Sequence, residues 1–181
     1  MTPTFASRVS TAGLLLLTLG LPVSASAQYQ LPGLVSSFKA DSLHEAAVTL
    51  AHTTHRWRDA ASLHRRSAAL RSVDDPLAYR CLREAAAIAY AVNDRSSART
   101  DMAKAASQAL ARGDLRAAAD AYLDAAWIAQ EQGKPRQVWE LGHRAEMLAD
   151  SPYLNASDRA AILQRISRSG ESTQLAMRVG R

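Results

Sequence analysis

The sequence has one cysteine, Cys81, and no segment in which polar and apolar residues alternate over the length of a strand. A single cysteine cannot form an internal disulfide, so the domain must be held together by its packed core. Without alternating segments, a half-buried sheet is not expected. These two absences argue against a disulfide scaffold and a β-rich fold, and a length of 181 residues fits one domain.

Motifs of common enzyme classes are also missing. There is no Gly-x-Ser-x-Gly elbow and no glycine-rich phosphate loop. The 22 basic residues, of which only Lys39, Lys104 and Lys134 are lysines, are scattered among 17 acidic residues and give a formal net charge of +5. So mild an excess, without a basic run, is not typical of a nucleic-acid-binding protein. We therefore expect no enzymatic activity, no cofactor and no nucleic-acid partner.

The longest apolar stretch lies near the N-terminus. Arg8 precedes the run TAGLLLLTLGLPV, and SASAQ follows it with small residues at positions 25 and 27. This order is typical of a secretory signal peptide, which we expect to span residues 1–27 and to be cut before Gln28. The alternative is a buried N-terminal helix. No later stretch is long enough to span a membrane, so the sequence predicts a periplasmic or secreted protein.

A 20-residue repeat runs through the rest of the chain. The pattern LxxAAxxA begins at Leu82, and the alanines recur at the same spacing after Met102 and Tyr122; a weaker copy begins at Gly142. Alanines at these intervals give a helix one smooth face, so that neighbouring helices can approach closely. The repeat therefore predicts several similar helices packed side by side.

Turn-forming residues keep the same 20-residue step. Asn93, Gly113 and Gly133 each follow a copy of the repeat at the same interval, and both residue types tolerate the left-handed backbone that ends a helix. Short connectors make successive helices antiparallel. The sequence thus predicts an all-α domain over residues 41–168. The expected helices span residues 41–54, 57–72, 77–92, 95–111, 115–131, 135–149 and 157–168.

Several local features refine this prediction. Asp41 and Ser157 are expected to cap the first and last helices, and Pro135 suits a first helical turn. Residues 28–40 and 169–181 lie outside the repeat and are expected to be loosely ordered. Cys81 is expected to pack as a small apolar residue, with an intermolecular disulfide as the alternative.

Part of the repeat resembles a known family. Gly113-Asp114, followed by Ala118 and Tyr122, is similar to the turn and second helix of a tetratricopeptide repeat, and a looser match begins at Asn93. The resemblance covers most of the chain after residue 40, although two helices take about 40 residues here and 34 in the family. It implies antiparallel hairpins stacked as a short α-solenoid. A compact antiparallel helical bundle is the alternative.

The resemblance also implies a function. Such arrays offer a concave groove to an extended peptide or helix of a partner protein. Tyr90 and Trp127 would be the main anchors, since amphipathic aromatic residues anchor interfaces; alternatively, both are core residues. We expect a binding module in an envelope-associated assembly. By family analogy, the groove-facing residues are Glu45, His52, Arg83, Tyr90, Trp127 and Gln130.

The histidines suggest a second hypothesis. His52 and His55 stand about one helical turn apart, a spacing at which two imidazoles can chelate a metal ion. No cysteine or carboxylate obviously completes the ligand shell. The alternative function is a small periplasmic metal-binding protein that uses a histidine cluster. Its candidate ligands are His44, His52, His55 and His64.

Arg112-Gly113-Asp114 is the tripeptide that animal integrins read on adhesive proteins. Here Gly113 is in register with the other turn residues of the repeat, so a tight helix-to-helix turn accounts for it. We interpret the tripeptide as a turn rather than as an adhesion signal.

Overall fold

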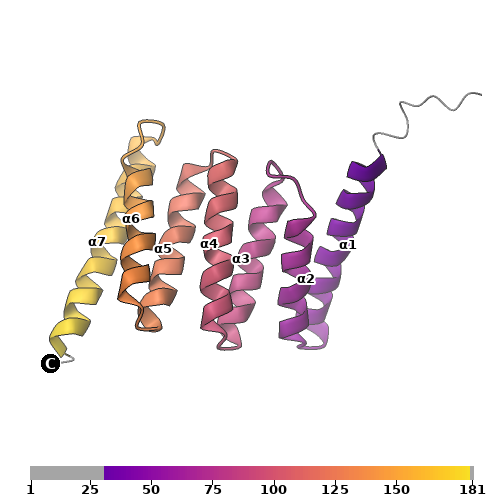
Figure 1. Ribbon diagram of the computed structural model, residues 1–181, viewed down its shortest axis with the longest axis horizontal. Coiled ribbons are helices and arrows are strands. Elements are labelled where there is room, and N and C mark those ends of the chain that lie inside the picture. The colour runs from indigo at the N-terminus through magenta and orange to yellow at the C-terminus, as the bar shows by residue number, and fades with distance from the viewer. Residues whose placement is uncertain (1–30, 180–181) are drawn as a thin grey trace, which may run out of the picture. The chain divides into compact units, whose positions relative to one another are not determined.

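A computed structural model describes the backbone of residues 31–179 and the side chains of residues 35–169. The expected signal peptide, residues 1–27, lies outside the described residues. All regular secondary structure in the described part is helical, which confirms the predicted all-α fold (Figure 1). Its seven helices are α1 (Leu31–Thr53), α2 (Trp57–Ala69), α3 (Pro76–Ala91), α4 (Arg95–Ala111), α5 (Leu115–Glu131), α6 (Pro135–Ala149) and α7 (Ala156–Val179).

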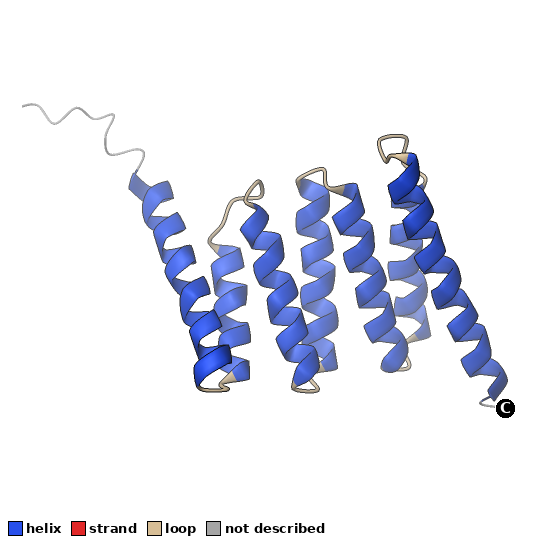
Figure 2. Ribbon diagram, turned by 180° about the vertical axis from the view of Figure 1, so that it is seen from behind, coloured by secondary structure: helices blue, strands red, loops and turns tan. Residues whose placement is uncertain are grey.

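Within residues 32–181 the helices lie in two rows. Helices α2, α4 and α6 face the viewer in Figure 1, whereas α1, α3, α5 and α7 face the viewer in Figure 2, which shows the molecule from behind. From α2 to α7 each helix packs against the next one, and α7 also contacts α5. The helices therefore form stacked antiparallel hairpins. None of the described helices is both long and apolar enough to cross a membrane.

The alanine repeat forms the interfaces between the helices. In its three strong copies, no alanine of the pattern is more than 7% exposed. The larger residue that opens each copy, Leu82, Met102 or Tyr122, is buried beside these alanines. Small side chains let the helix backbones approach closely, and the many resulting contacts add up to a stable interface.

Three turns share one hydrogen-bonded geometry. Asn93, Gly113 and Gly133 have φ angles of +63°, +80° and +64°. In each turn the N–H of the following residue donates to the carbonyl five residues earlier, over 2.8, 2.9 and 3.0 Å. This is the Schellman ending of a helix. Asp94 and Asp114 then accept a backbone N–H of the next helix through their carboxylates. The predicted turns are therefore confirmed.

The Arg112-Gly113-Asp114 tripeptide is one of these turns. The guanidinium of Arg112 donates to the carboxylate of Asp114 over 3.1 Å. Both charged side chains of the tripeptide therefore interact with each other, and Asp114 also caps α5. The interpretation of the tripeptide as a helix-to-helix turn is confirmed.

Both ends of the helical region extend beyond the expected bounds. Helix α1 begins at Leu31 and α7 continues to Val179, so parts of the segments expected to be loosely ordered are helical. In α1, the hydroxyl of Ser36 donates to the carbonyl of Leu70 over 2.9 Å, and Ala40 is buried. These contacts hold the additional turns of α1 against the end of α2. They depend on tertiary packing, which the 20-residue repeat does not predict at this position.

Both expected helix caps are wrong, whereas the expected place of Pro135 is correct. Asp41 lies inside α1 because the helix starts earlier, and its carboxylate accepts a hydrogen bond from Arg71 over 2.6 Å. At the start of α7, Asn155 rather than Ser157 accepts a backbone N–H of the first turn, over 2.8 Å. Pro135 occupies the first turn of α6, as predicted.

Candidate functional site

The structure brings together half of the residues that were predicted to bind a partner. The rings of Tyr90 and Trp127 lie against each other, with 5.2 Å between centroids and 34° between planes. Gln130 lines the same pocket as Trp127. Glu45 and His52 are exposed on α1 and take no part in that pocket.

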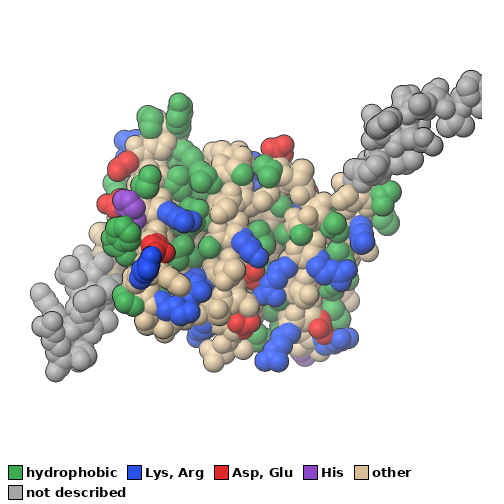
Figure 3. All heavy atoms as spheres, viewed as in Figure 1, with side chains coloured by type: hydrophobic (Ala, Val, Ile, Leu, Met, Phe, Trp, Pro, Cys, Tyr) green, Lys and Arg blue, Asp and Glu red, His purple; other side chains and the backbone are tan. Residues whose placement is uncertain are grey.

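A pocket of about 270 Å³ opens between α5, α6 and α7, and we call it the C-terminal notch. Two of its walls are indoles: Trp127 is 49% exposed and Trp139 is 67% exposed. Figure 3 shows hydrophobic side chains over the α6 end of the face that it draws. The notch thus presents large apolar side chains to solvent. Its defining residues are Trp127, Gln130, Val138, Trp139, Glu146 and Ile166.

Polar contacts hold the ring of Tyr90 against the indole of Trp127. The phenol of Tyr90 donates to the carboxylate of Glu131 over 2.9 Å, and the guanidinium of Arg95 lies 3.7 Å from the centre of the Tyr90 ring. Partial burial and the hydrogen bond to Glu131 raise the pKa of Tyr90, so the phenol stays a donor. Tyr90 therefore supports the indole of Trp127, which is the more exposed of the two rings.

Arg83 belongs to a network of charges along α3, α5 and α7. Its guanidinium lies 3.7 Å from the carboxylate of Asp124. Arg165 of α7 donates to Asp124 and to Asp120, each over 2.7 Å. The network links helices that are not neighbours in the sequence. Arg83 thus has a partner within the chain and does not line the pocket that contains Trp127 and Gln130.

The row formed by α2, α4 and α6 carries two shallow grooves that the sequence did not indicate. One, of about 370 Å³, lies between α2 and α4 and is lined by Arg65 and Lys104; another, of about 340 Å³, lies between α4 and α6 and is lined by Arg99 and Arg144. Basic side chains spread over this face in Figure 3. Because the 20-residue repeat makes successive helices equivalent, it cannot predict which row carries a groove.

Of the four histidines predicted to bind a metal ion, the structure brings two together. His44 and His64 stand with their ring centroids 5.2 Å apart. His52 is exposed in the last turn of α1. His55 lies in the following turn, with a φ angle of +53°, and its ring lies against Trp57. Neither His52 nor His55 belongs to the group that His44 and His64 form.

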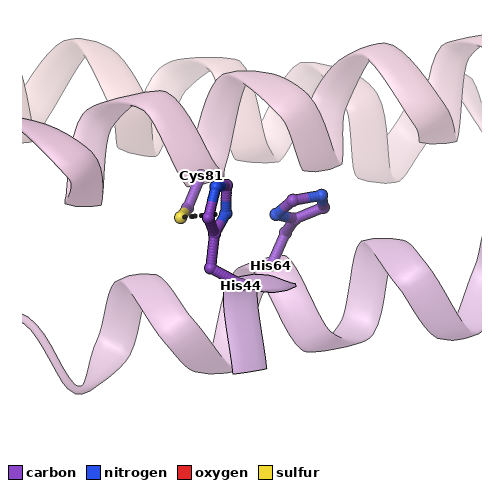
Figure 4. Close-up of side chains that lie close together, drawn as sticks. All are labelled: His44, His64 and Cys81. Carbon is purple, nitrogen blue, oxygen red and sulfur yellow. Dashed lines mark hydrogen bonds between the residues drawn. The ribbon is translucent and has the colours of Figure 1, made fainter. Parts of the chain in front are cut away.

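A cysteine from the next helix joins the two imidazoles. The ligand atoms of His44, His64 and Cys81 all lie within 4.8 Å of one another (Figure 4). Sγ of Cys81 lies 3.4 Å from Nδ1 of His44, and Oε2 of Glu84 lies 3.3 Å from Nδ1 of His64. Cys81 is fully buried, as predicted. We call these four residues the N-terminal cluster.

Burial keeps two groups of the N-terminal cluster, the His64 imidazole and the Cys81 thiol, uncharged. It lowers the pKa of His64; the charge of Glu84 acts in the opposite direction, and His44 lowers this pKa further. Burial also raises the pKa of the Cys81 thiol. His64 is therefore a neutral imidazole at neutral pH, and Cys81 carries its proton while no cation is bound.

Sequence reasoning missed Cys81 and Glu84 as neighbours of the histidines. The two residues stand three positions apart on α3, so they share one helix face. That spacing was visible in the sequence. What was not visible is that this face of α3 turns towards α1 and α2.

Compared with protein-family models, curated proteins and solved structures, the chain matches none of them significantly. The resemblance to tetratricopeptide repeats therefore stays a prediction. Functional inference depends on the C-terminal notch and the N-terminal cluster themselves.

Proposed function

We propose that the protein is an exported helical-repeat binding module whose C-terminal notch holds a short segment of a partner protein. The observation that supports this function is the exposure of two indoles, Trp127 at 49% and Trp139 at 67%, around one pocket. Tryptophan is highly buried on average in folded proteins. It is also among the residues that carry most of the binding energy at protein interfaces.

The size and lining of the notch favour a peptide side chain as its occupant. Its volume of about 270 Å³ lies below the roughly 300–1,000 Å³ of pockets that enclose small molecules. The walls formed by Val138 and Ile166 are apolar, whereas Gln130 and Glu146 supply polar groups at the same pocket. An apolar side chain fits between the indoles, and the amide of Gln130 can bond the backbone of the bound segment.

The indole of Trp127 is already held in place. Tyr90 lies against it, and Glu131 and Arg95 fix Tyr90 in turn. A side chain that is ordered before binding loses little conformational entropy when the partner arrives. This arrangement supports Trp127 as the principal anchor, with Trp139 as the second.

Export is the other part of the proposal, and it rests on the sequence of residues 1–27. Expression of the full chain in a bacterium with a secretion pathway should yield a mature protein that begins at Gln28. The intact mass of the protein released from the periplasm checks this. An unprocessed chain that stays in the cytoplasm would contradict export without affecting the notch.

Peptide selection against the folded chain tests the notch. Peptides from a random library should be enriched in aromatic and branched apolar residues. Trp127→Ala and Trp139→Ala should each weaken the selected peptides by roughly tenfold or more, as hot-spot tryptophans do. Titration calorimetry measures this loss.

Trp57→Ala is the matched control, because Trp57 is also a partly exposed tryptophan, 38% exposed on α2. It should leave the affinity within about twofold, an effect typical of residues outside a hot spot. Equal losses in all three variants, or no loss in the two notch variants, would overturn the proposal.

A further inference from the structure

We propose that the N-terminal cluster is a structural zinc site, in which His44, His64 and Cys81 bind one Zn²⁺ ion and Glu84 is the fourth ligand. The ligands come from three consecutive helices: His44 from α1, His64 from α2, and Cys81 and Glu84 from α3. Figure 4 shows the two imidazoles side by side, with the thiol of Cys81 directed at His44. The site is separate from the C-terminal notch and does not depend on it.

Three of the ligand-to-ligand distances in the cluster are close to those of a zinc shell. Tetrahedral zinc, with Zn–S of about 2.3 Å and Zn–N of about 2.0–2.1 Å, places neighbouring ligand atoms roughly 3.3–3.6 Å apart. The cluster has 3.4 Å between His44 Nδ1 and Cys81 Sγ, 3.3 Å between His64 Nδ1 and Glu84 Oε2, and 3.8 Å between His44 Nδ1 and Glu84 Oε2. The ligand atoms of His44, His64 and Cys81 lie within 4.8 Å of one another, and Glu84 is not part of that group. Side-chain rotations must therefore draw the four ligands together when the ion binds.

Two buried atoms of the cluster have no hydrogen-bond partner among the described residues: Nδ1 of His64 and Oε2 of Glu84. They lie 3.3 Å apart, but not in hydrogen-bond geometry. The side chain of His64 is only 3% exposed, so water does not compensate it. A buried acceptor without a partner costs about 1–3 kcal/mol. A cation bound between them would satisfy both atoms.

The ligand types favour zinc. Imidazole nitrogen, thiolate sulfur and carboxylate oxygen are the three groups that bind Zn²⁺ in proteins. On binding, the S–H bond of Cys81 breaks, an S–Zn bond forms and the proton passes to solvent. One thiolate and one carboxylate then balance the two positive charges of the ion. A neutral site is the arrangement that a buried position tolerates best.

Neighbouring residues orient the ligands. The guanidinium of Arg80 donates to Oε1 of Glu84 over 2.9 Å, which leaves Oε2 for the ion. The hydroxyl of Ser67 donates to the carbonyl of Ala40 over 2.7 Å and lies 3.6 Å from Cys81 Sγ. Outer contacts of this kind fix the orientation of metal ligands. Four protein ligands leave no open position, so the ion would join α1 to α2 and α3 rather than catalyse a reaction.

Zinc titration of the metal-free full-length chain, in competition with a chromophoric chelator, tests the site. We expect one Zn²⁺ per chain. His64→Gln and Cys81→Ser should weaken zinc binding by at least roughly 100-fold, because loss of even an outer contact costs about 10–100-fold. Glu84→Gln should also weaken it, by about tenfold or more. Unchanged affinity in the His64 and Cys81 variants would overturn the proposal.

His52→Gln and His55→Gln are the matched controls, since these exposed histidines are close in sequence but are not part of the cluster. Their zinc affinity should stay within about twofold of the unmodified chain, as expected for residues outside the shell. If these variants lose zinc while the cluster variants keep it, the ion binds at the surface and the buried site is refuted.

X-ray absorption of the zinc-loaded chain needs no substitution, so it stays decisive even where a cluster variant fails to fold. The expected shell has one sulfur at about 2.3 Å and three nitrogen or oxygen atoms at about 2.0–2.2 Å. A shell without sulfur would contradict the assignment.

Discussion

The N-terminal cluster and the C-terminal notch lie at opposite ends of the same stack of helices. Between α1 and α3, two imidazoles and a thiol are withdrawn from solvent, and His64 and Cys81 are at most 2% exposed. Between α5 and α7, two indoles are presented to solvent at 49% and 67%. The alanine interfaces that join the two ends are nearly identical in the three strong copies.

This difference shows where the sequence is free to vary. In a helical repeat, each unit packs only on its neighbours, and here small alanines make those interfaces. The larger side chains at either end are therefore not needed to hold the middle together. Buried polar side chains at the α1–α3 end and exposed aromatic side chains at the α5–α7 end are both unfavourable in the free protein. These two features are the basis for the proposed metal ion at one end and the proposed peptide at the other.

The largest effect is expected from Ile162→Ala in α7. Ile162 is the largest fully buried side chain among the described residues, so the cavity should lower the free energy of unfolding by about 2–5 kcal/mol. Urea unfolding followed by tryptophan fluorescence measures the change. The neighbouring Leu163 is 43% exposed, and Leu163→Ala should cost far less. Equal losses would mean that α7 does not pack as described.

Arg71→Met tests the N-terminal end. The side chain of Arg71 is 3% exposed and bonds Asp41 of α1 over 2.6 Å and Asp75 over 2.8 Å. Its removal should lower the free energy of unfolding by about 1–3 kcal/mol, because Asp75 and the more exposed Asp41 lose charged hydrogen bonds to a buried guanidinium. Thermal unfolding measures this. Arg136→Met is the control, since Arg136 is 90% exposed beside Glu140, and such pairs contribute about 0–1 kcal/mol. If Arg71→Met lowered the free energy of unfolding no more than Arg136→Met does, the hydrogen bonds of Arg71 to Asp41 and Asp75 would be contradicted.

Replacing a glycine in a turn and a glycine in a helix should change the stability in opposite directions. Gly113 has a φ angle of +80°, and no atom lies within 4 Å of the position that an alanine methyl group would take. Gly113→Ala should therefore cost about 1–2 kcal/mol through backbone strain alone. Gly142 is helical and equally uncrowded, so Gly142→Ala should stabilise by about 0.5–1 kcal/mol. Chemical denaturation of both variants checks the opposite signs. A stabilising effect at Gly113 would contradict the turn geometry.

The smallest effect on stability is expected at Trp139. Trp139→Ala removes a mostly exposed side chain, so the free energy of unfolding should change by about 0.5 kcal/mol or less. Trp127→Ala also removes the ring contact with Tyr90 and should cost about 0.5–1.5 kcal/mol. Zinc affinity should not change, because the cluster lies in α1–α3. Loss of zinc binding in these variants would show that the two ends are coupled.

The sequence predicted the helices and turns well for a physical reason. Alanine spacing and left-handed turn residues are local properties, and both repeat every 20 residues. Helices α4, α5 and α6 accordingly have the expected bounds. The start of α1 could not be predicted in this way, since it depends on the contact between Ser36 and the end of α2.

The sites were only partly predictable. Trp127 and Gln130 came from the family resemblance, and they do lie together. Val138, Trp139 and Ile166 join them through the packing of α6 and α7 on α5, which no local pattern encodes. In the same way, His44 and Cys81 are 37 residues apart, and their 3.4 Å contact requires the α1–α3 packing.

Hydrogen exchange of the intact protein, with and without a selected peptide, tests the central claim most directly. Peptide binding at the notch should slow exchange in α5, α6 and the first half of α7, and leave α1–α3 unchanged. Protection confined to α2 and α4, or no protection at all under saturating peptide, would contradict a binding site at the C-terminal notch.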